Sequence, residues 1–358
     1  MIRLGAAVAL LAVFGVVAGI ATVASRGEPS DAYVVRRLVS DEGRRAPRVD
    51  LRLRNAWGLA ASQTGPWWTA NEASSTSTLY AGSGRKQLLN VIVAGGPTGI
   101  VYQGGAGFRV ASHGASDPAR FIYACEDGRL RTWTPTVPTA WSTQAVVSVD
   151  ASREAAVFRG LALADERLYA TDFHNGRVDV FDRQWRRIRR AGAFVDRSIP
   201  QWYAPFGIQA IGDQIFVTYV WRAPVNGNDA PTGGYVDEFD RDGNLVAHVG
   251  RNGALNAPWG IALAPRTFGR YGGDLLVGNF GDGRVNAYRR SDGGWTVHGT
   301  LRDRHGEPLV VNGLWGIGFG NDAGAGPADT LFFTSGPHQW RGVTELGVHG
   351  VLGSISAR

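Results

Sequence analysis

Asn55-Ala-Trp-Gly-Leu-Ala and Ala257-Pro-Trp-Gly-Ile-Ala-Leu are two copies of the short element that decides the fold of this chain. Further copies are Phe158-Arg-Gly-Leu-Ala-Leu, Ala204-Pro-Phe-Gly-Ile-Gln and Gly313-Leu-Trp-Gly-Ile-Gly-Phe, with a degraded copy in Pro97-Thr-Gly-Ile-Val. Each copy is followed by a second apolar run with a polar end, such as Leu275-Leu-Val-Gly-Asn. The aligned glycines follow one another at intervals of 41 to 61 residues: Gly58, Gly99, Gly160, Gly207, Gly260 and Gly316. Such repeats, with short apolar strands between turns, are typical of propeller blades, so the sequence predicts an all-β, six-bladed β-propeller.

The composition agrees with one large β-domain. The chain has 358 residues, of which 44% are hydrophobic, and its 50 glycines and 12 tryptophans suit tight hairpins with aromatic packing. Because the repeats extend to the end of the chain, we expect a single propeller over residues 33–358. The formal net charge of +6 is modest, and no nucleic-acid motif accompanies the basic cluster Arg183-Gln-Trp-Arg-Arg-Ile-Arg-Arg. That cluster is interpreted either as a solvated outer hairpin or as a contact with an anionic surface.

The N-terminus has the pattern of an export signal. Arg3 precedes the apolar run from Leu4 to Val23, and Thr22-Val-Ala offers small residues before a cleavage point. Residues 1–25 are therefore predicted to be a signal peptide or, if uncleaved, an N-terminal membrane anchor. The protein is expected to be exported, as a periplasmic, extracellular or membrane-anchored monomer, with the membrane contacted only through this segment.

The single cysteine excludes an internal disulfide bond. Cys125 lies in an apolar run, which favours a buried structural thiol over a reactive one.

The two ends of the propeller domain are predicted to close the ring. The run Tyr33-Val-Val-Arg-Arg-Leu-Val precedes the first repeat, and we expect it to pair with Gly350-Val-Leu-Gly-Ser-Ile-Ser in the last blade. This pairing would cover a sheet edge that is otherwise open.

In the fourth repeat, an insertion from Trp221 to Gly233 replaces the short hairpin, and its length predicts a lid.

The loops that enter the first strand and leave the second strand of each blade open on one face of a propeller, so two rings of residues are expected there. The aromatic ring comprises Trp57, Phe158, Phe206, Trp259 and Trp315. The polar ring comprises Asn71, Glu72, Glu126, Asp127, Asp172, His174, Tyr219, Asn279, Ser335 and His338. A concave face with aromatic walls and converging polar groups predicts a ligand site. Each ring also has a structural interpretation: aromatic residues before glycine pack neighbouring blades, and Asp127, Asn175 and Asp282 serve turns.

Four of the polar residues suggest a metal. Glu72, Glu126, Asp172 and Asn279 offer carboxylate and amide oxygens, the donors that calcium prefers. Only His174 and His338 are placed on this face, so a zinc site with three histidines is excluded. Nucleophilic catalysis is not supported either, because the chain has no Gly-x-Ser-x-Gly motif.

The repeats resemble a family of exported bacterial proteins known only as conserved hypothetical proteins, similar in pattern to NHL-repeat propellers. The resemblance rests on the repeats quoted above and on Gly273-Asp-Leu-Leu-Val-Gly-Asn-Phe-Gly-Asp-Gly-Arg-Val-Asn, and it covers residue 33 to the end. It implies six blades and assigns no activity or catalytic residue. More distant six-bladed relatives include gluconolactonase-like and paraoxonase-like calcium enzymes. Their calcium ligands are acidic and amide residues near the channel, and the four residues proposed above are of the same types, but the chain shares no sequence motif with these enzymes.

The sequence thus predicts an exported propeller that binds a small molecule, a glycan or a protein on its channel face, and no nucleic acid. The alternative is a calcium-dependent hydrolase of the lactonase or esterase type, in which the ion polarises a carbonyl and a carboxylate acts as base. A mainly structural envelope protein is the third interpretation. Because propellers host many unrelated activities, the fold alone does not choose among these functions.

Overall fold

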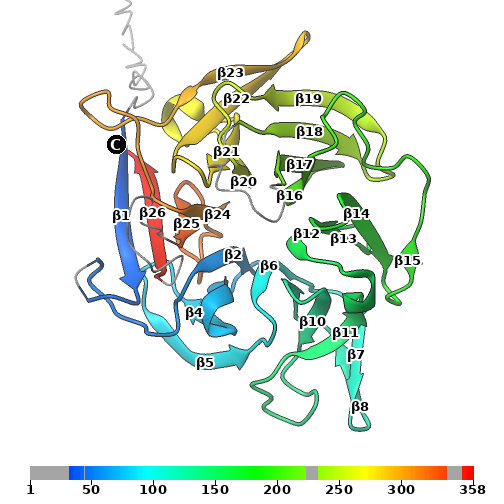
Figure 1. Cartoon of the computed structure of the whole chain (residues 1–358). Coiled ribbons are helices and arrows are strands. Elements are labelled where there is room, and N and C mark those ends of the chain that lie inside the picture. Colours follow the sequence, from blue (N-terminus) through cyan, green and yellow to red (C-terminus); the bar gives the residue numbers. More distant parts are fainter. Residues whose placement is uncertain (1–31, 44, 223–232, 337–348) are drawn as a thin grey trace, which may run out of the picture.

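The computed structural model describes residues 32–43, 45–222, 233–336 and 349–358. Within these residues, six four-stranded antiparallel sheets stand around a central axis, as Figure 1 shows. The chain is therefore a six-bladed β-propeller, as the repeats predicted. The signal or anchor segment proposed for residues 1–25 and most of the proposed lid lie outside the described residues. Within the described part of the chain, no helix has the length and apolar character needed to cross a membrane.

Each blade begins at the channel and proceeds outward through successive hairpins, except for the outermost strand of the sixth blade. Blade one contains β2 (Ala56–Ala61), β3 (Trp67–Asn71), β4 (Thr76–Tyr80) and β5 (Lys86–Ile92). Blade two contains β6 (Pro97–Tyr102), β9 (Phe121–Cys125), β10 (Arg129–Trp133) and β11 (Val146–Asp150), with a side hairpin of β7 (Arg109–Ser112) and β8 (Ala115–Pro118). Blade three contains β12 (Phe158–Ala164), β13 (Arg167–Asp172), β14 (Arg177–Asp182) and β15 (Arg187–Ile188).

The other three blades repeat this order. Blade four contains β16 (Tyr203–Ile211), β17 (Gln214–Trp221), β18 (Tyr235–Asp240) and β19 (Leu245–Arg251). Blade five contains β20 (Pro258–Leu263), β21 (Leu275–Asn279), β22 (Val285–Ser291) and β23 (Gly294–Thr300). Blade six contains β24 (Leu314–Phe319), β25 (Leu331–Ser335), β26 (Val351–Ala357) and β1 (Tyr33–Ser40). The only helical segments among the described residues are three single 3₁₀ turns, at Glu72–Ser74, Ser152–Glu154 and Gly269–Tyr271.

The ring is closed by the two ends of the chain. Strand β1 pairs antiparallel with β26, from Tyr33 opposite Ala357 to Ser40 opposite Val351, which confirms the predicted closure. Tyr33 also joins this strand to blade five, because its hydroxyl donates to the Phe268 carbonyl at 3.0 Å. The strand therefore covers the free edge of β26 and ties the last blade to its neighbour.

The repeated glycines lie where neighbouring inner strands approach each other around the channel. A Cβ atom on Gly207 would stand 2.0 Å from the carbonyl oxygen of Trp259 in the next blade. The equivalent distances from Gly260 to the Trp315 carbonyl and from Gly316 to the Trp57 carbonyl are 2.5 and 2.8 Å. No side chain fits at such distances, so glycine is required for close packing of the six inner strands.

A threonine in several second strands completes this arrangement. The hydroxyl of Thr218 accepts the N–H of Gly207 at 2.8 Å, and Thr171 does the same for Gly160. Thr171 then donates to the carbonyl of Phe206 in the next blade at 2.8 Å. These hydroxyls satisfy the glycine N–H groups at the point where the pairing of the first two strands is irregular.

Cys125 is fully buried at the end of β9, as its apolar surroundings predicted. Burial raises the pKa of its thiol to about 12, so at pH 8 only about one molecule in ten thousand carries the thiolate. We expect Cys125 to react with a disulfide reagent at least about a hundredfold more slowly in the native protein than in denaturant. Absorbance of the released thiolate at pH 8 measures both rates, and equal rates would contradict this burial.

Candidate functional site

The channel is blocked at one end by a cluster of aromatic rings. Trp57, Phe206, Trp259 and Trp315 are buried there against one another, with Phe173 and Phe280 packed on them. The rings of Trp57 and Trp315 stack with centroids 3.5 Å apart, and Phe280 stacks on Trp315 at 3.9 Å. The aromatic residues before the repeated glycines thus pack on each other across the axis, in addition to contacting neighbouring blades.

Below this cluster the channel is narrow. The cavity between the six inner strands has a volume of about 40 Å³, which is comparable with the volume of one water molecule. A ligand that reaches the aromatic cluster must therefore approach from the outer face of the cluster.

The indole N–H groups in this cluster are not all satisfied. Trp315 donates to the Oδ1 atom of Asn55 at 3.2 Å. The Nε1 atoms of Trp57 and Trp259 are buried and have no hydrogen-bond partner. Because buried indole N–H groups normally have an acceptor, these two donors indicate a place for water or for a ligand.

Arg159 is the charged member of the inner ring. Its guanidinium lies over the ring of Trp57 at 5.2 Å and over that of Phe173 at 5.6 Å, and it forms an ion pair with Glu126. Burial lowers the pKa of Arg159 to about 10, and the charge of Glu72 opposes this decrease. The Nε atom of Arg159 is a third buried donor without a partner.

Two carboxylates lie beside Arg159. Oxygen atoms of Glu126 and Glu72 are 3.2 and 3.5 Å from the position that a Cβ atom on Gly96 would occupy, so they flank the same point of the channel face. Glu72 accepts a hydrogen bond from the Nδ2 atom of Asn55 at 2.6 Å, and Asn55 in turn accepts from Trp315. This chain of contacts connects the acidic pair to the aromatic cluster.

The strand register explains which polar residues reach this face. In every blade an equivalent pair joins the first two strands directly before the irregularity in their register: Ala56–Asn71, Pro97–Cys125, Phe158–Asp172, Pro205–Tyr219, Pro258–Asn279 and Leu314–Ser335. All six second-strand residues in these pairs are buried. The next residue along each strand faces the channel: Glu72, Glu126, Phe173, Val220, Phe280 and Gly336. In all blades except the fourth the strand ends between the two positions, so one step along the chain separates the buried set from the channel set.

The predicted polar ring therefore mixed two different positions. Glu72 and Glu126 come together on the channel face, whereas Asn71, Asp172, Tyr219 and Asn279 do not. Asn71 is bonded to the hydroxyls of Thr69 and Thr78 at 2.8 Å. Asp172 accepts the backbone N–H of Val157 at 3.1 Å and the side chain of Asn175 at 2.7 Å, so it organises the hairpin.

The structure places Phe158 and His174 away from the channel face. Phe158 is buried between blades two and three, and Arg159 takes the inner-ring position in blade three. His174 is exposed in the β13–β14 hairpin, where its carbonyl accepts from Arg222. His338 lies outside the described residues.

The four proposed calcium ligands do not fit a shared ion. The side chain of Asp172 has backbone, Asn175 and Arg177 partners, and Asn279 donates to the Ala254 carbonyl at 2.8 Å. Among the described residues, only one group of three or more His, Cys, Asp or Glu side chains has its ligand atoms within 4.8 Å of one another. That group contains none of the four.

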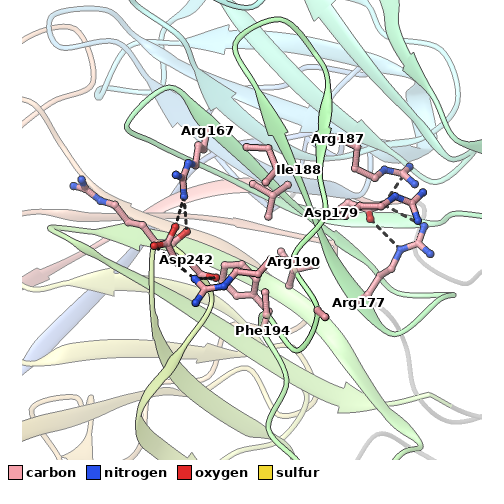
Figure 2. A pocket seen from close by; sticks show the side chains of 14 residues that line it. Arg167, Arg177, Asp179, Arg187, Ile188, Arg190, Phe194 and Asp242 are labelled. Atoms are coloured by element: carbon pink, nitrogen blue, oxygen red, sulfur yellow. Dashed lines mark hydrogen bonds and ion pairs between the residues drawn. The ribbon is translucent and has the colours of Figure 1, made fainter.

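A separate cavity lies between the outer parts of blades three and four. Figure 2 shows this space of about 430 Å³, which includes residues of the basic segment that follows β14. Its arginines are paired with carboxylates: Arg167 with Asp242 at 2.6 Å and Arg177 with Asp179 at 2.9 Å. Ion pairs also compensate much of the charge of the basic segment, which pairs with β14 as an outer hairpin: Arg183 with Glu166, Arg186 with Asp182, Arg187 with Glu154 and Arg190 with Asp242.

The polar groups of the channel face come from one side of the ring, whereas the aromatic rings come from several blades. Blades one to three contribute Asn55, Glu72, Glu126 and Arg159, and blades four to six contribute mainly aromatic and apolar side chains. The fold and this face define a six-bladed propeller whose channel is blocked by aromatic rings from several blades, with the polar and charged side chains of blades one to three beside them.

Comparison with known proteins places the chain in a family. It is 31% identical to uncharacterised protein L690 of Acanthamoeba polyphaga mimivirus over 298 residues, which cover 80% of this chain and 78% of that protein. It is 33% identical to uncharacterised protein R648 of the same virus, with 80% of this chain and 73% of that protein covered. The chain belongs to the family of these two proteins. Both are viral, so they do not support the expected restriction to bacteria. No family model matches the chain.

Solved structures share the fold at low identity. A streptogramin B lyase is 11% identical with a TM-score of 0.52, covering 92% of this chain and 100% of the lyase. A protein of unknown function from Bacteroides thetaiotaomicron is 11% identical with a TM-score of 0.54, covering 91% of this chain and 76% of that protein. A putative glucose dehydrogenase from a Thermus species is 15% identical with a TM-score of 0.51, covering 90% of this chain and 100% of that protein. These likenesses establish the propeller architecture alone.

Proposed function

We propose that this protein is an exported binding protein whose channel face takes a small hydroxylated ligand, such as a sugar. The observation that carries the proposal is the convergence of unpartnered donors and carboxylate acceptors beside aromatic rings. Trp57, Trp259 and Arg159 each hold a buried N–H without an acceptor. Glu72 and Glu126 supply acceptors at the same face.

The residue types suit a ligand that has both hydroxyl groups and an apolar side. Hydroxyls accept from indole and guanidinium N–H groups and donate to carboxylates, so one compound satisfies both sets. Aromatic rings offer flat apolar surface at little cost in conformational entropy. A fully apolar ligand would leave the three donors unsatisfied, which costs about 1–3 kcal/mol for each buried group.

The geometry does not favour a calcium-dependent hydrolase. Such an enzyme needs a set of oxygen ligands around one ion, and only Glu72 and Glu126 of the four candidates meet on this face. The export component of the proposal rests on the sequence of residues 1–25.

A thermal-shift panel tests the proposal. We expect at least one neutral mono- or disaccharide at millimolar concentration to raise the melting temperature, because a ligand that binds only the native state stabilises it. The Glu72→Gln/Glu126→Gln double variant should lose this response, since it removes two charged acceptors. Glu307→Gln, an exposed glutamate with no ion partner among the described residues, is the matched control and should respond as the wild type does.

Two outcomes would contradict the proposed function. One is a panel of sugars and polyols with no effect on the wild-type protein. The other is a sugar response that persists in the double variant, because the site would then lie elsewhere. Turnover of a lactone or ester that requires added calcium would instead support the hydrolase.

A further inference from the structure

A second cluster lies in blade four, away from the channel. His248 on β19 places its Nδ1 atom 2.9 Å from Oδ1 of Asp237 on β18 and 3.5 Å from Oδ2 of Asp196. Asp196 belongs to the segment that connects blades three and four. One ligand atom from each of these three side chains lies within 4.8 Å of the other two.

The sheet register brings these groups together. Asp237 is paired with Val217 on one side and with His248 on the other, so the side chains of Val217, Asp237 and His248 lie on one face of blade four. The rest of this face packs on blade three, with Val217, Tyr219 and Phe239 in the shared core. Asp237 is therefore a carboxylate at the edge of an apolar interface.

Asp237 is incompletely satisfied. Its side chain is fully buried, and its Oδ2 atom has no hydrogen-bond partner. A buried carboxylate oxygen without a partner is costly, which indicates a missing cation or donor at this point.

Tyr219 provides a separate observation. It is paired with Tyr235, two positions from the Val217–Asp237 pair, so its side chain lies on the same face as Asp237. Its hydroxyl is buried and has no hydrogen-bond partner. Burial raises the pKa of Tyr219 well above its usual value, and the nearby charges of Asp237 and Asp196 raise it further. Two unpartnered polar groups in an apolar interface thus border the same cluster.

We propose that Asp196, Asp237 and His248 form a binding site for a divalent transition-metal ion. Two carboxylates and one imidazole are a mixed oxygen and nitrogen set that suits zinc, iron or manganese better than calcium. Bonds of about 2.0–2.2 Å in tetrahedral geometry place ligand atoms about 3.3–3.6 Å apart. The separations of 2.9 and 3.5 Å between these atoms need only small side-chain movements to reach that range.

Arg251 is the internal competitor for this position. Its Nη2 atom lies 2.7 Å from Oδ2 of Asp196 and 2.6 Å from Nδ1 of His248, and it also contacts Ser198. The guanidinium therefore supplies positive charge where the ion would bind. The Arg251 side chain is partly exposed, so it can turn towards solvent when an ion binds the carboxylates of Asp196 and Asp237.

Calorimetric titration of the purified protein with Zn²⁺ tests the proposal, with Mn²⁺ and Ca²⁺ titrated separately. We expect one Zn²⁺ per chain at this site and weaker binding of Ca²⁺. His248→Gln should weaken Zn²⁺ binding at least about tenfold. Because 43% of the His248 side chain is exposed, this variant is expected to fold. Arg251→Gln should bind Zn²⁺ more tightly, since it removes the competing charge.

His298→Gln is the matched control, because His298 also contacts a buried aspartate, Asp274, without a second carboxylate in a three-residue group. Its Zn²⁺ affinity should equal that of the wild type. The proposal is overturned if the wild-type protein binds no Zn²⁺, or if His248→Gln binds Zn²⁺ as tightly as the wild type does. Loss of binding in the His298 variant alone would also overturn it.

Discussion

Alanine at Gly207 is expected to destabilise the propeller by about 3 kcal/mol or more, the upper part of the range for overpacked sites. The added Cβ atom would lie 2.0 Å from the carbonyl oxygen of Trp259 and 2.8 Å from its carbonyl carbon. Both are backbone atoms of an inner strand, so they cannot move aside as a flexible side chain would. Relief of the contact requires blades four and five to separate at the channel.

The bonds on both sides of Gly207 prevent a local adjustment. Its N–H is held by the Thr218 hydroxyl at 2.8 Å, and the cavity between the inner strands is only about 40 Å³. We expect the midpoint of thermal unfolding to fall by at least about 5 °C.

Gly293→Ala is the control, because a Cβ atom there would meet only the Ser291 hydroxyl at 3.9 Å. Circular dichroism during heating measures both variants. Equal stability of Gly207→Ala and the wild type would contradict the closely packed ring.

Alanine at Trp315 is the second substitution with a large expected effect. The side chain is 2% exposed and stacks between Trp57 and Phe280 at the centre of the aromatic cluster. Removing a buried ring of this size costs about 3–5 kcal/mol through lost burial and the remaining cavity. The variant also loses the hydrogen bond to Asn55, which positions Glu72.

This substitution should therefore reduce both stability and sugar binding. Trp141→Ala is the matched control, because the Trp141 side chain is 91% exposed, and it should change the unfolding free energy by less than about 0.5 kcal/mol. Denaturant unfolding gives the two free energies. A Trp315 variant as stable as the Trp141 variant would contradict the central role assigned to the cluster.

The number of blades could be predicted from the sequence because the ring imposes the same requirement six times. Each inner strand must approach its neighbour closely, so a glycine recurs at an equivalent position, such as Gly207 and Gly260. Ring closure was predictable for a related reason, since Tyr33–Ser40 is an apolar strand without a partner in the first repeat. Features that every blade needs leave a repeated pattern.

The candidate site was predictable only in part. The pattern identified the aromatic residues and the ends of the second strands, but it did not show whether Asn71 or Glu72 faces the channel. The strand ends between these two neighbours, and a short polar run at a strand end has no periodicity that would fix which residue faces the channel. Arg159 could have been found by alignment on Gly160, which places it in the column of Trp57 and Trp259.

The cluster of Asp196, Asp237 and His248 had no comparable signal in the sequence. Its residues come from a connecting segment and the two outer strands of a single blade, where the repeats differ. Only the antiparallel pairing of β18 with β19 places Asp237 opposite His248. A feature that occurs in only one blade leaves no repeated pattern in the sequence, so it becomes visible only in the folded chain.

Nuclear magnetic resonance of the indole N–H groups tests the channel-face site most directly. With ¹⁵N-labelled tryptophan, the sugar that stabilises the wild-type protein most should shift the Trp57 and Trp259 signals, since both donors lack a partner in the free protein. The Trp133 signal should stay unchanged, because its N–H is already bonded to the Ser142 carbonyl at 2.9 Å. If saturating sugar leaves the Trp57 and Trp259 signals in place, the ligand binds elsewhere and the proposed channel-face site is wrong.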